Sequence, residues 1–119
     1  MAISATDPIQ SVLEAAMRGA EQNQTLLTSD LANADTANFQ PSSVNFQQQL
    51  ASAMAAGTPA SQVSFTPTTA AQTTNADGNG VSPDETSADL AENGLLYDAF
   101  ADILAAHNQT LQYAMQVGG

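Results

Sequence analysis

The longest hydrophobic pattern in this sequence is a seven-residue repeat in its C-terminal third. Within residues 86–117, apolar side chains return at every seventh position, at Leu90, Tyr97, Leu104 and Leu111. A second row, three positions later, contains Phe100 and His107. Such a repeat places a stripe along one side of a helix that another helix covers. Because Leu96, Ile103 and Met115 widen the stripe, we expect this helix to pack on more than one neighbour.

A second amphipathic helix is predicted near the N-terminal end. Asp7 can cap the exposed amide groups of its first turn, and Pro8 suits a position that needs no hydrogen-bond donor. One stripe then recurs at spacings of three and four and consists of Ile9, Leu13, Ala16, Ala20, Gln24, Leu27 and Leu31. An ordinary amphipathic helix explains this stripe. The polar Gln24 within it can alternatively select the register between two helices.

The segment between the two helices is polar and rich in turn-forming residues. Asn and Asp side chains in residues 31–39 favour a break in the chain direction. Residues 44–46 and 63–65 favour short strands, and residues 45–56 favour a helical segment. Residues 36–76 contain no Asp, Glu, Lys or Arg, and they offer little bulky apolar surface to offset about 1–2 kcal/mol of backbone entropy per residue. We expect this middle to be flexible in isolation and to fold when neighbours cover it.

Residues 77–85 combine a turn with the start of the C-terminal helix. The run Asp77-Gly78-Asn79-Gly80 is typical of a tight hairpin or loop. Its spacing resembles calcium-binding loops, but Val81, Ser82 and Ala88 occupy the positions that need an oxygen ligand, a glycine and a glutamate. Ser82 and Pro83 then repeat the cap and proline that start the first helix.

The chain is strongly acidic. Its 119 residues include twelve Asp or Glu against the single Arg18, which gives a formal charge of −11. This balance argues against nucleic acid and against direct lipid binding, because clustered Lys and Arg supply the affinity for both. The absence of Cys excludes a disulfide scaffold and thiolate-bound zinc. No stretch approaches the roughly 20 apolar residues of a membrane span, and we expect neither a membrane helix nor a cleavable secretion signal.

No group of residues predicts an enzyme. His107 lies at a core position of the last helix without a second His, so we interpret it as a partly buried structural residue. Asp98 and Asp102 are four residues apart without a basic partner, which is typical of a solvated helix face. Gly78 and Gly80 lack the Lys of a phosphate-binding loop. We therefore expect no catalytic residues, no cofactor and no metal.

These patterns predict a mainly α fold in three parts. Residues 1–38 form the N-terminal helix and the break after it, residues 39–81 form a loop or small β element, and residues 82–119 form the C-terminal heptad helix. Two long terminal helices can form a coiled-coil-like antiparallel pair, or they can bundle with the same helices of other subunits. The broad apolar stripe favours the second arrangement.

Two parts of the sequence resemble a known family. The run Leu31-Ala32-Asn33-Ala34-Asp35-Thr36-Ala37-Asn38-Phe39 resembles the Ala-Asn-x-x-Thr-Pro-Gly-Tyr signature of bacterial flagellar axial proteins, although Ala37, Asn38 and Phe39 replace its Pro, Gly and Tyr. Asp77-Gly78-Asn79-Gly80-Val81 and the later Ala91-Glu92-Asn93-Gly94-Leu95-Leu96-Tyr97 are similar to patterns of the proximal rod FlgB family. The resemblance covers roughly residues 8–46 and 77–115.

The resemblance implies a structural subunit of the flagellar basal-body rod, which polymerises through its terminal helices into the drive shaft and export channel required for motility. It implies a place in the periplasm-spanning rod and export by the flagellar type III apparatus. Implied partners are further copies of the chain, other rod proteins, the export-gate adaptor FliE and the membrane ring of the basal body. The residues expected at the assembly interface are Leu13, Leu27, Leu31, Asn33, Thr36, Phe39, Leu90, Asn93, Tyr97, Phe100, Leu104 and Leu111. The alternative is a soluble acidic helical adaptor or secretion chaperone, which would share the acidity, the heptad repeat and the lack of Cys.

Overall fold

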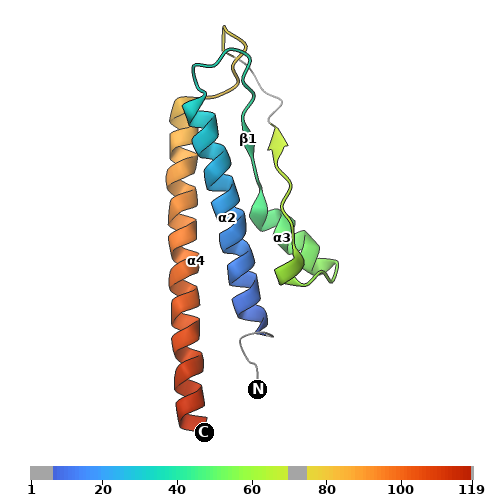
Figure 1. Ribbon diagram of the computed structural model, residues 1–119, viewed down its shortest axis with the longest axis vertical. Helices are drawn as coiled ribbons and strands as arrows, with labels where there is room; N and C mark the ends of the chain where they lie inside the picture. Colours follow the sequence, from blue (N-terminus) through green and yellow to red (C-terminus); the bar gives the residue numbers. More distant parts are fainter. Residues whose placement is uncertain (1–6, 70–74, 119) are drawn as a thin grey trace.

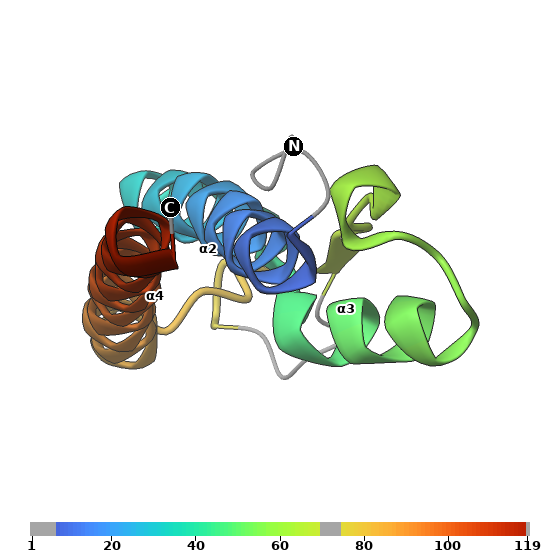
Figure 2. The same cartoon turned by 90° about the horizontal axis from the view of Figure 1, so that it is seen from below.

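The computed structural model describes residues 7–69 and 75–118. This part of the chain is mainly helical, as predicted, and elongated, with extents of 66 × 27 × 15 Å. Its elements in order are helix α2 (Pro8–Ala32), strand β1 (Ser42–Ser43), helix α3 (Phe46–Ala55), the 3₁₀ helix η1 (Ala60–Gln62), strand β2 (Thr68–Thr69) and helix α4 (Pro83–Gly118). Helices α2 and α4 lie side by side and run in opposite directions, while α3 and the strands lie beside α2, away from α4 (Figures 1 and 2).

The start of α2 confirms the sequence prediction. Asp7 has an extended backbone, and its carboxylate accepts hydrogen bonds from the backbone N–H groups of Ile9 and Gln10. Pro8 occupies the first turn, where its missing donor costs nothing. The helix ends at Ala32, and the chain then turns back over residues 33–38, in the predicted break.

The start of α4 is also confirmed. The helix begins at Pro83, and the Ser82 hydroxyl accepts a hydrogen bond from the Glu85 N–H at 3.5 Å. Asp84 and Glu85 place negative charge in the first turn, where the helix dipole favours it. The helix runs without a break through Gly94.

The predicted strands at residues 44–46 and 63–65 are wrong in position. The strands form instead at polar residues, with Ser42 opposite Thr69 and Ser43 opposite Thr68 in an antiparallel pair. Val44 and Val63 are buried against α2 rather than paired. The predicted helix at residues 45–56 is confirmed as α3. The strand pair shows that residues 39–81, expected to form either a loop or a small β element, contain a small β element. The polar middle predicted to be flexible also includes residues 70–74, which lie outside the described residues.

The core is thin and lies along α2. One cluster joins Ala15 and Ala16 of α2 to Leu50, Ala60 and Val63. The other contains Ala20, Val44 and Phe46. Phe46 fits against Gly19, where no larger residue would leave room for its ring. It also meets Phe65 and Phe100 edge to face, with ring centroids 6.4 and 6.2 Å away. Phe46 thereby connects α2, α3 and α4 through one side chain.

Candidate assembly surface

The two signature-like stretches meet at the turn end of the helix pair. Asn79 is fully buried, and its side-chain amide donates hydrogen bonds to the backbone carbonyls of Asn33 and Thr36. Its Oδ1 accepts from the Val81 N–H at 2.7 Å, and the Gly80 N–H donates to the Phe39 carbonyl at 2.9 Å. These carbonyls follow the last turn of α2 and need partners. The loop before α4 thus caps the end of α2.

A buried amide cluster joins α2 to α4 halfway along the pair. Asn93 is 3% exposed, and its Nδ2 donates to the Ala20 carbonyl at 2.7 Å and to Gln24 Oε1 at 2.8 Å. Its Oδ1 accepts from Asn23 Nδ2 at 3.1 Å. The other end of the Asn23 amide accepts from the Val44 N–H at 2.9 Å. Sliding one helix along the other would break these hydrogen bonds, so the cluster holds the two helices in register.

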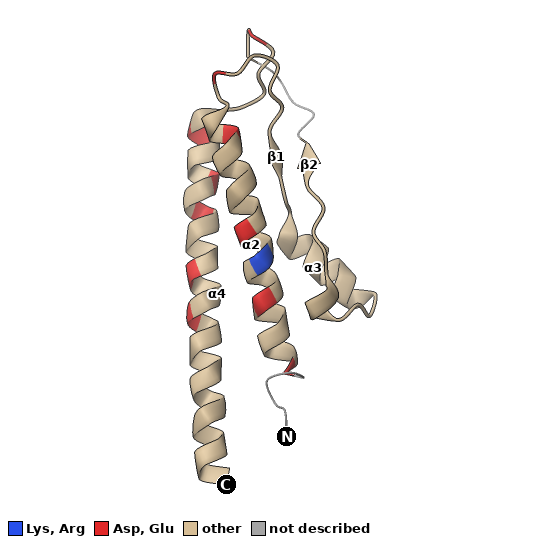
Figure 3. Cartoon of the chain, in the orientation of Figure 1, with Lys and Arg blue, Asp and Glu red and all other residues tan. Residues whose placement is uncertain are grey.

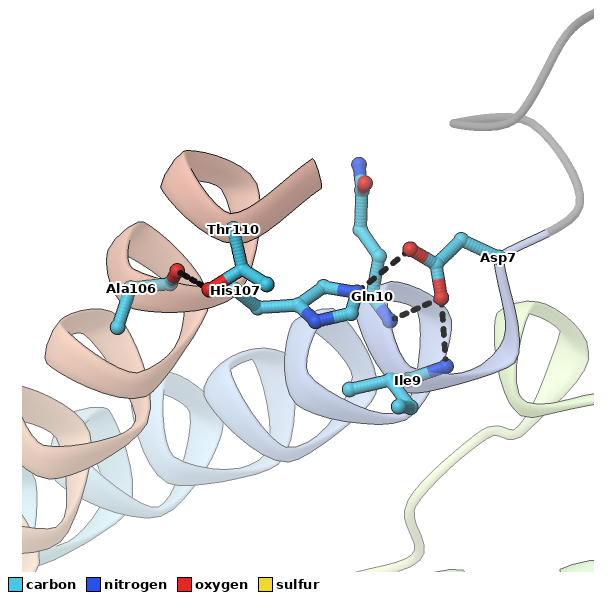
Figure 4. Close-up of polar contacts among 6 residues, drawn as sticks. All are labelled: Asp7, Ile9, Gln10, Ala106, His107 and Thr110. Atoms are coloured by element: carbon cyan, nitrogen blue, oxygen red, sulfur yellow. Dashed lines mark hydrogen bonds and ion pairs between the residues drawn. The ribbon is translucent and has the colours of Figure 1, made fainter. Parts of the chain in front are cut away.

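A third contact holds the other end of the pair together. His107 Nε2 of α4 lies 2.6 Å from Asp7 Oδ2, while Asp7 Oδ1 accepts the capping hydrogen bonds of α2 (Figure 4). The bond to His107 holds the pKa of Asp7 below its ordinary value, and the backbone bonds from Gln10 and Ile9 act in the same direction. One carboxylate therefore caps α2 and ties its first turn to α4.

Helix α4 is covered on one side only. The heptad residues Leu90, Tyr97, Leu104 and Leu111 are half-buried, and the fully buried residues of α4 are Thr86 and Asn93. Because His107 pairs with the cap of α2, residues 108–118 of α4 extend beyond the first residue of α2 (Figure 1). Large apolar side chains are exposed there, including Tyr113 at 70% and Val117 at 77%.

Charge is distributed unevenly along the molecule. Asp and Glu lie on the upper half of α4, along α2 and in the loops at the turn end, whereas the lower part of α4 has none (Figure 3). Residues 103–118 contain no Asp, Glu, Lys or Arg. Arg18 donates to the backbone carbonyls of Ala60 and Val63 at 3.3 and 3.5 Å and so holds η1 against α2. Among the described residues, which include all twelve Asp and Glu side chains, the one contact within 4.0 Å between an acidic and a basic side chain joins Asp7 to His107.

The residues expected at the assembly interface fall into two groups. Asn33, Thr36 and Phe39 surround the buried Asn79 at the turn end. The others lie along the two paired helices, where Leu27 and Asn93 are buried and the rest are half-buried; these are Leu13, Leu31, Leu90, Tyr97, Phe100, Leu104 and Leu111. Asp98 and Asp102 are exposed, as expected for a solvated face. His107 is half-buried and hydrogen-bonded.

Sequence reasoning missed several residues that organise this surface. Asn79 is central to the turn end, but its sequence context indicated only a turn. Asn23 is polar within an amphipathic helix, and no local signal places it beside Asn93. The predicted register role of Gln24 has a structural counterpart in its hydrogen bond to Asn93.

Comparison with models of known protein families found no match, and comparison with curated proteins found no significant relative. None of the helices in the described ranges contains an apolar stretch that could span a bilayer. Within the same ranges, no group of three or more His, Cys, Asp or Glu is placed to hold a metal ion.

Proposed function

We propose that this chain is a structural subunit of the bacterial flagellar basal-body rod and polymerises through its terminal helices. Its partners in this proposal are further copies of itself, other rod proteins, the export-gate adaptor FliE and the membrane ring. It would reach the rod by type III export and would take part in the drive shaft and export channel that motility requires.

The observation that carries the proposal is the uncovered apolar surface of α4. Its last eleven residues, 108–118, extend beyond α2 and expose Tyr113, Met115 and Val117, at 70%, 59% and 77%. A helix that projects from its own fold with such side chains gains stability when another helix covers it. The absence of charge in residues 103–118 supports contact between copies, because chains of charge −11 repel one another elsewhere on their surfaces.

The half-buried heptad row supports the finer part of the proposal, which is coiled-coil-like packing between subunits. Leu90, Tyr97, Leu104 and Leu111 are each only partly buried. A cavity of about 380 Å³ lies between α2 and α4 beside one of them, Tyr97, and Ala20, Gln24 and Gly94 also line it. A helix from a neighbouring subunit would fill such a groove and complete the seam.

The meeting of the signature-like stretches gives independent support. Asn79, in the first of the two FlgB-like stretches, donates hydrogen bonds to the carbonyls of Asn33 and Thr36 in the axial-like stretch, 46 and 43 positions earlier in the sequence.

The test is assembly by the full chain with substitutions on the exposed end of α4. Tyr113→Ser and Val117→Ser remove largely exposed apolar side chains, whereas Gln112→Ser and Gln116→Ser change exposed polar residues of the same turns. In a bacterium that encodes this chain, we expect the first pair to abolish swimming in soft agar and to leave basal bodies without a rod by electron microscopy. The control pair should swim normally.

Circular dichroism of the purified variants shows whether each change spares the fold. Normal rods and swimming with Tyr113→Ser and Val117→Ser, or with the gene deleted, would refute the proposal. A stable dimer of the purified chain by sedimentation, together with normal rods after deletion, would favour the adaptor or chaperone alternative instead.

A further inference from the structure

Two Asn residues of this chain, Asn79 and Asn93, are each followed directly by Gly. Because Gly has no Cβ, its backbone is mobile and its nitrogen is sterically open in an unfolded chain. That nitrogen can attack the side-chain carbonyl carbon of the preceding Asn, since the two groups are joined by a few bonds and meet often. The two Asn-Gly pairs are therefore the positions in the sequence where this attack meets least hindrance.

The attack converts the side-chain amide into a carboxylate. The backbone nitrogen after the Asn loses its proton to water or hydroxide and forms a bond to Cγ. The bond from Cγ to the amide nitrogen breaks, and that nitrogen takes a proton from water and leaves as ammonia. Water then opens the resulting cyclic imide at either carbonyl and leaves Asp or isoaspartate. The sum consumes water, releases ammonium and adds a negative charge, and no oxidant, metal or second protein takes part.

In the folded chain, both Asn side chains are buried and held by hydrogen bonds. Asn79 is fully buried, and its Oδ1 accepts from the Val81 N–H at 2.7 Å. Asn93 is 3% exposed, and its Oδ1 accepts from Asn23 Nδ2 at 3.1 Å. Turning either side chain toward the following nitrogen would break these bonds.

The two attacking nitrogens are also engaged. The Gly80 N–H donates to the Phe39 carbonyl at 2.9 Å. Gly94 lies within α4, where each N–H donates to the carbonyl four residues earlier. Deamidation at either position therefore requires the surrounding structure to open first.

A deamidated side chain cannot rebuild the contacts that the amide made, because a carboxylate has no N–H to donate. Asn93 Nδ2 donates to the Ala20 carbonyl at 2.7 Å and to Gln24 Oε1 at 2.8 Å, so Asp in its place would direct a negative charge at two acceptor oxygens. Asn79 donates to two carbonyls that follow the last turn of α2, and the same conflict arises there. Burying such an unpaired charge is costly.

We propose that Asn79 and Asn93 are spontaneous deamidation sites that folding shields, and that their loss in the unfolded chain is irreversible and prevents folding. The unfolded chain thus has a limited chemical lifetime, whereas the folded chain reacts only when it opens. The proposal rests on the two Asn-Gly sequences and their hydrogen bonds, and it stands whether or not the chain is a rod subunit.

The first experiment compares deamidation of the full chain in high urea and in buffer, at the same mildly alkaline pH. Samples taken over time are digested with pepsin at acidic pH, which stops the reaction, and mass spectrometry gives the deamidated fraction at each Asn. In urea, Asn79 and Asn93 should react several-fold faster than Asn75 and Asn108, which precede Ala and Gln. In buffer, the rates at Asn79 and Asn93 should fall at least about tenfold, because the reaction then waits for opening of the fold.

Substitution of the glycines tests the mechanism. Gly94→Ala should slow the reaction of Asn93 in urea several-fold and leave that of Asn79 unchanged, and Gly80→Ala should do the reverse. Both measurements are made on unfolded chains. They therefore remain informative even though the new Cβ at position 80 would lie 3.0 Å from Pro41 in the fold.

A second experiment tests the consequence for folding. Chain aged in urea is returned to buffer, and size-exclusion chromatography separates folded from unfolded molecules. The folded fraction should retain intact Asn79 and Asn93, while chains deamidated at these positions should collect in the unfolded fraction. Deamidation at the half-buried Asn108 should be equal in both fractions.

Three results would each overturn the proposal. These are equal rates at Asn79 and Asn93 in urea and in buffer, no effect of the Gly substitutions on the rates in urea, and equal deamidation of Asn79 and Asn93 in the folded and unfolded fractions.

Discussion

Replacing Asn93 with Ala should destabilise the helix pair strongly for so small a change. The side chain is 3% exposed and takes part in three hydrogen bonds, at 2.7, 2.8 and 3.1 Å. Its removal leaves Asn23 Nδ2 and Gln24 Oε1 without these partners between the helices. The substitution thus removes three hydrogen bonds, and the groups that made them must either bind water or remain unpaired.

The expected magnitude follows from these contacts. Three hydrogen bonds at about 0.5–1.5 kcal/mol each contribute about 1.5–4.5 kcal/mol. Ala is a better helix former than Asn by up to about 0.7 kcal/mol, which opposes the loss. We therefore expect the free energy of unfolding to fall by about 2–3 kcal/mol.

The assay is urea unfolding of the full chain, followed by circular dichroism at the helix band. Asn108→Ala on the same helix is the matched control, because Asn108 is half-buried and donates no side-chain hydrogen bond to any described residue. Asn108→Ala changes helix propensity by the same amount as Asn93→Ala, and it should leave the free energy of unfolding unchanged or slightly higher. If Asn93→Ala costs no more than Asn108→Ala, the amide cluster does not hold the helices together.

Two further predictions concern backbone space and pH. Gly19→Ala should lower the free energy of unfolding by about 1–3 kcal/mol, because the new Cβ would overlap the Phe46 side chain. Gly94→Ala should raise the free energy of unfolding by up to about 1 kcal/mol, since nothing lies within 4 Å of the new Cβ. Urea unfolding of both variants tests these two predictions. A loss of stability in Gly94→Ala would contradict the second one. The bond to His107 lowers the pKa of Asp7 in the folded chain. The ionised Asp7 carboxylate therefore contributes its full stabilisation above the ordinary Asp pKa of about 4, and this contribution is lost as the pH falls through the lowered pKa of the folded state. A carboxyl NMR titration of the folded chain should show the pKa of Asp7 rising in His107→Gln, and an unchanged titration would rule out this coupling.

The sequence predicted best the features that depend on neighbouring residues. Both helix starts were located because a cap and a proline act within one turn, as at Asp7 with Pro8 and at Ser82 with Pro83. The end of α2 followed from the Asn-rich break for the same reason. Local chemistry determines these positions whatever the rest of the chain does.

Features set by distant contacts were not predictable in this way. Val44 and Phe46 favour strands by propensity, but burial against α2 determines their conformation, and the strands form at polar residues outside the predicted segments, at Ser42–Ser43 and Thr68–Thr69. Asn79 and Asn93 look like ordinary polar residues in sequence. Their roles depend on groups 43 to 73 positions away, which no local pattern reports.

The placement of the Asp7–His107 contact has a mechanical consequence. Helices α2 and α4 run in opposite directions, and the Asp7–His107 contact joins them at the end from which α4 projects (Figure 1). A force applied to the chain before Asp7 therefore acts first on this single contact. The helices would then peel apart turn by turn, breaking a few contacts at a time, instead of sliding along their whole length at once. Mechanical extraction from that end should meet its main resistance later, when the peeling front reaches the amides around Asn93.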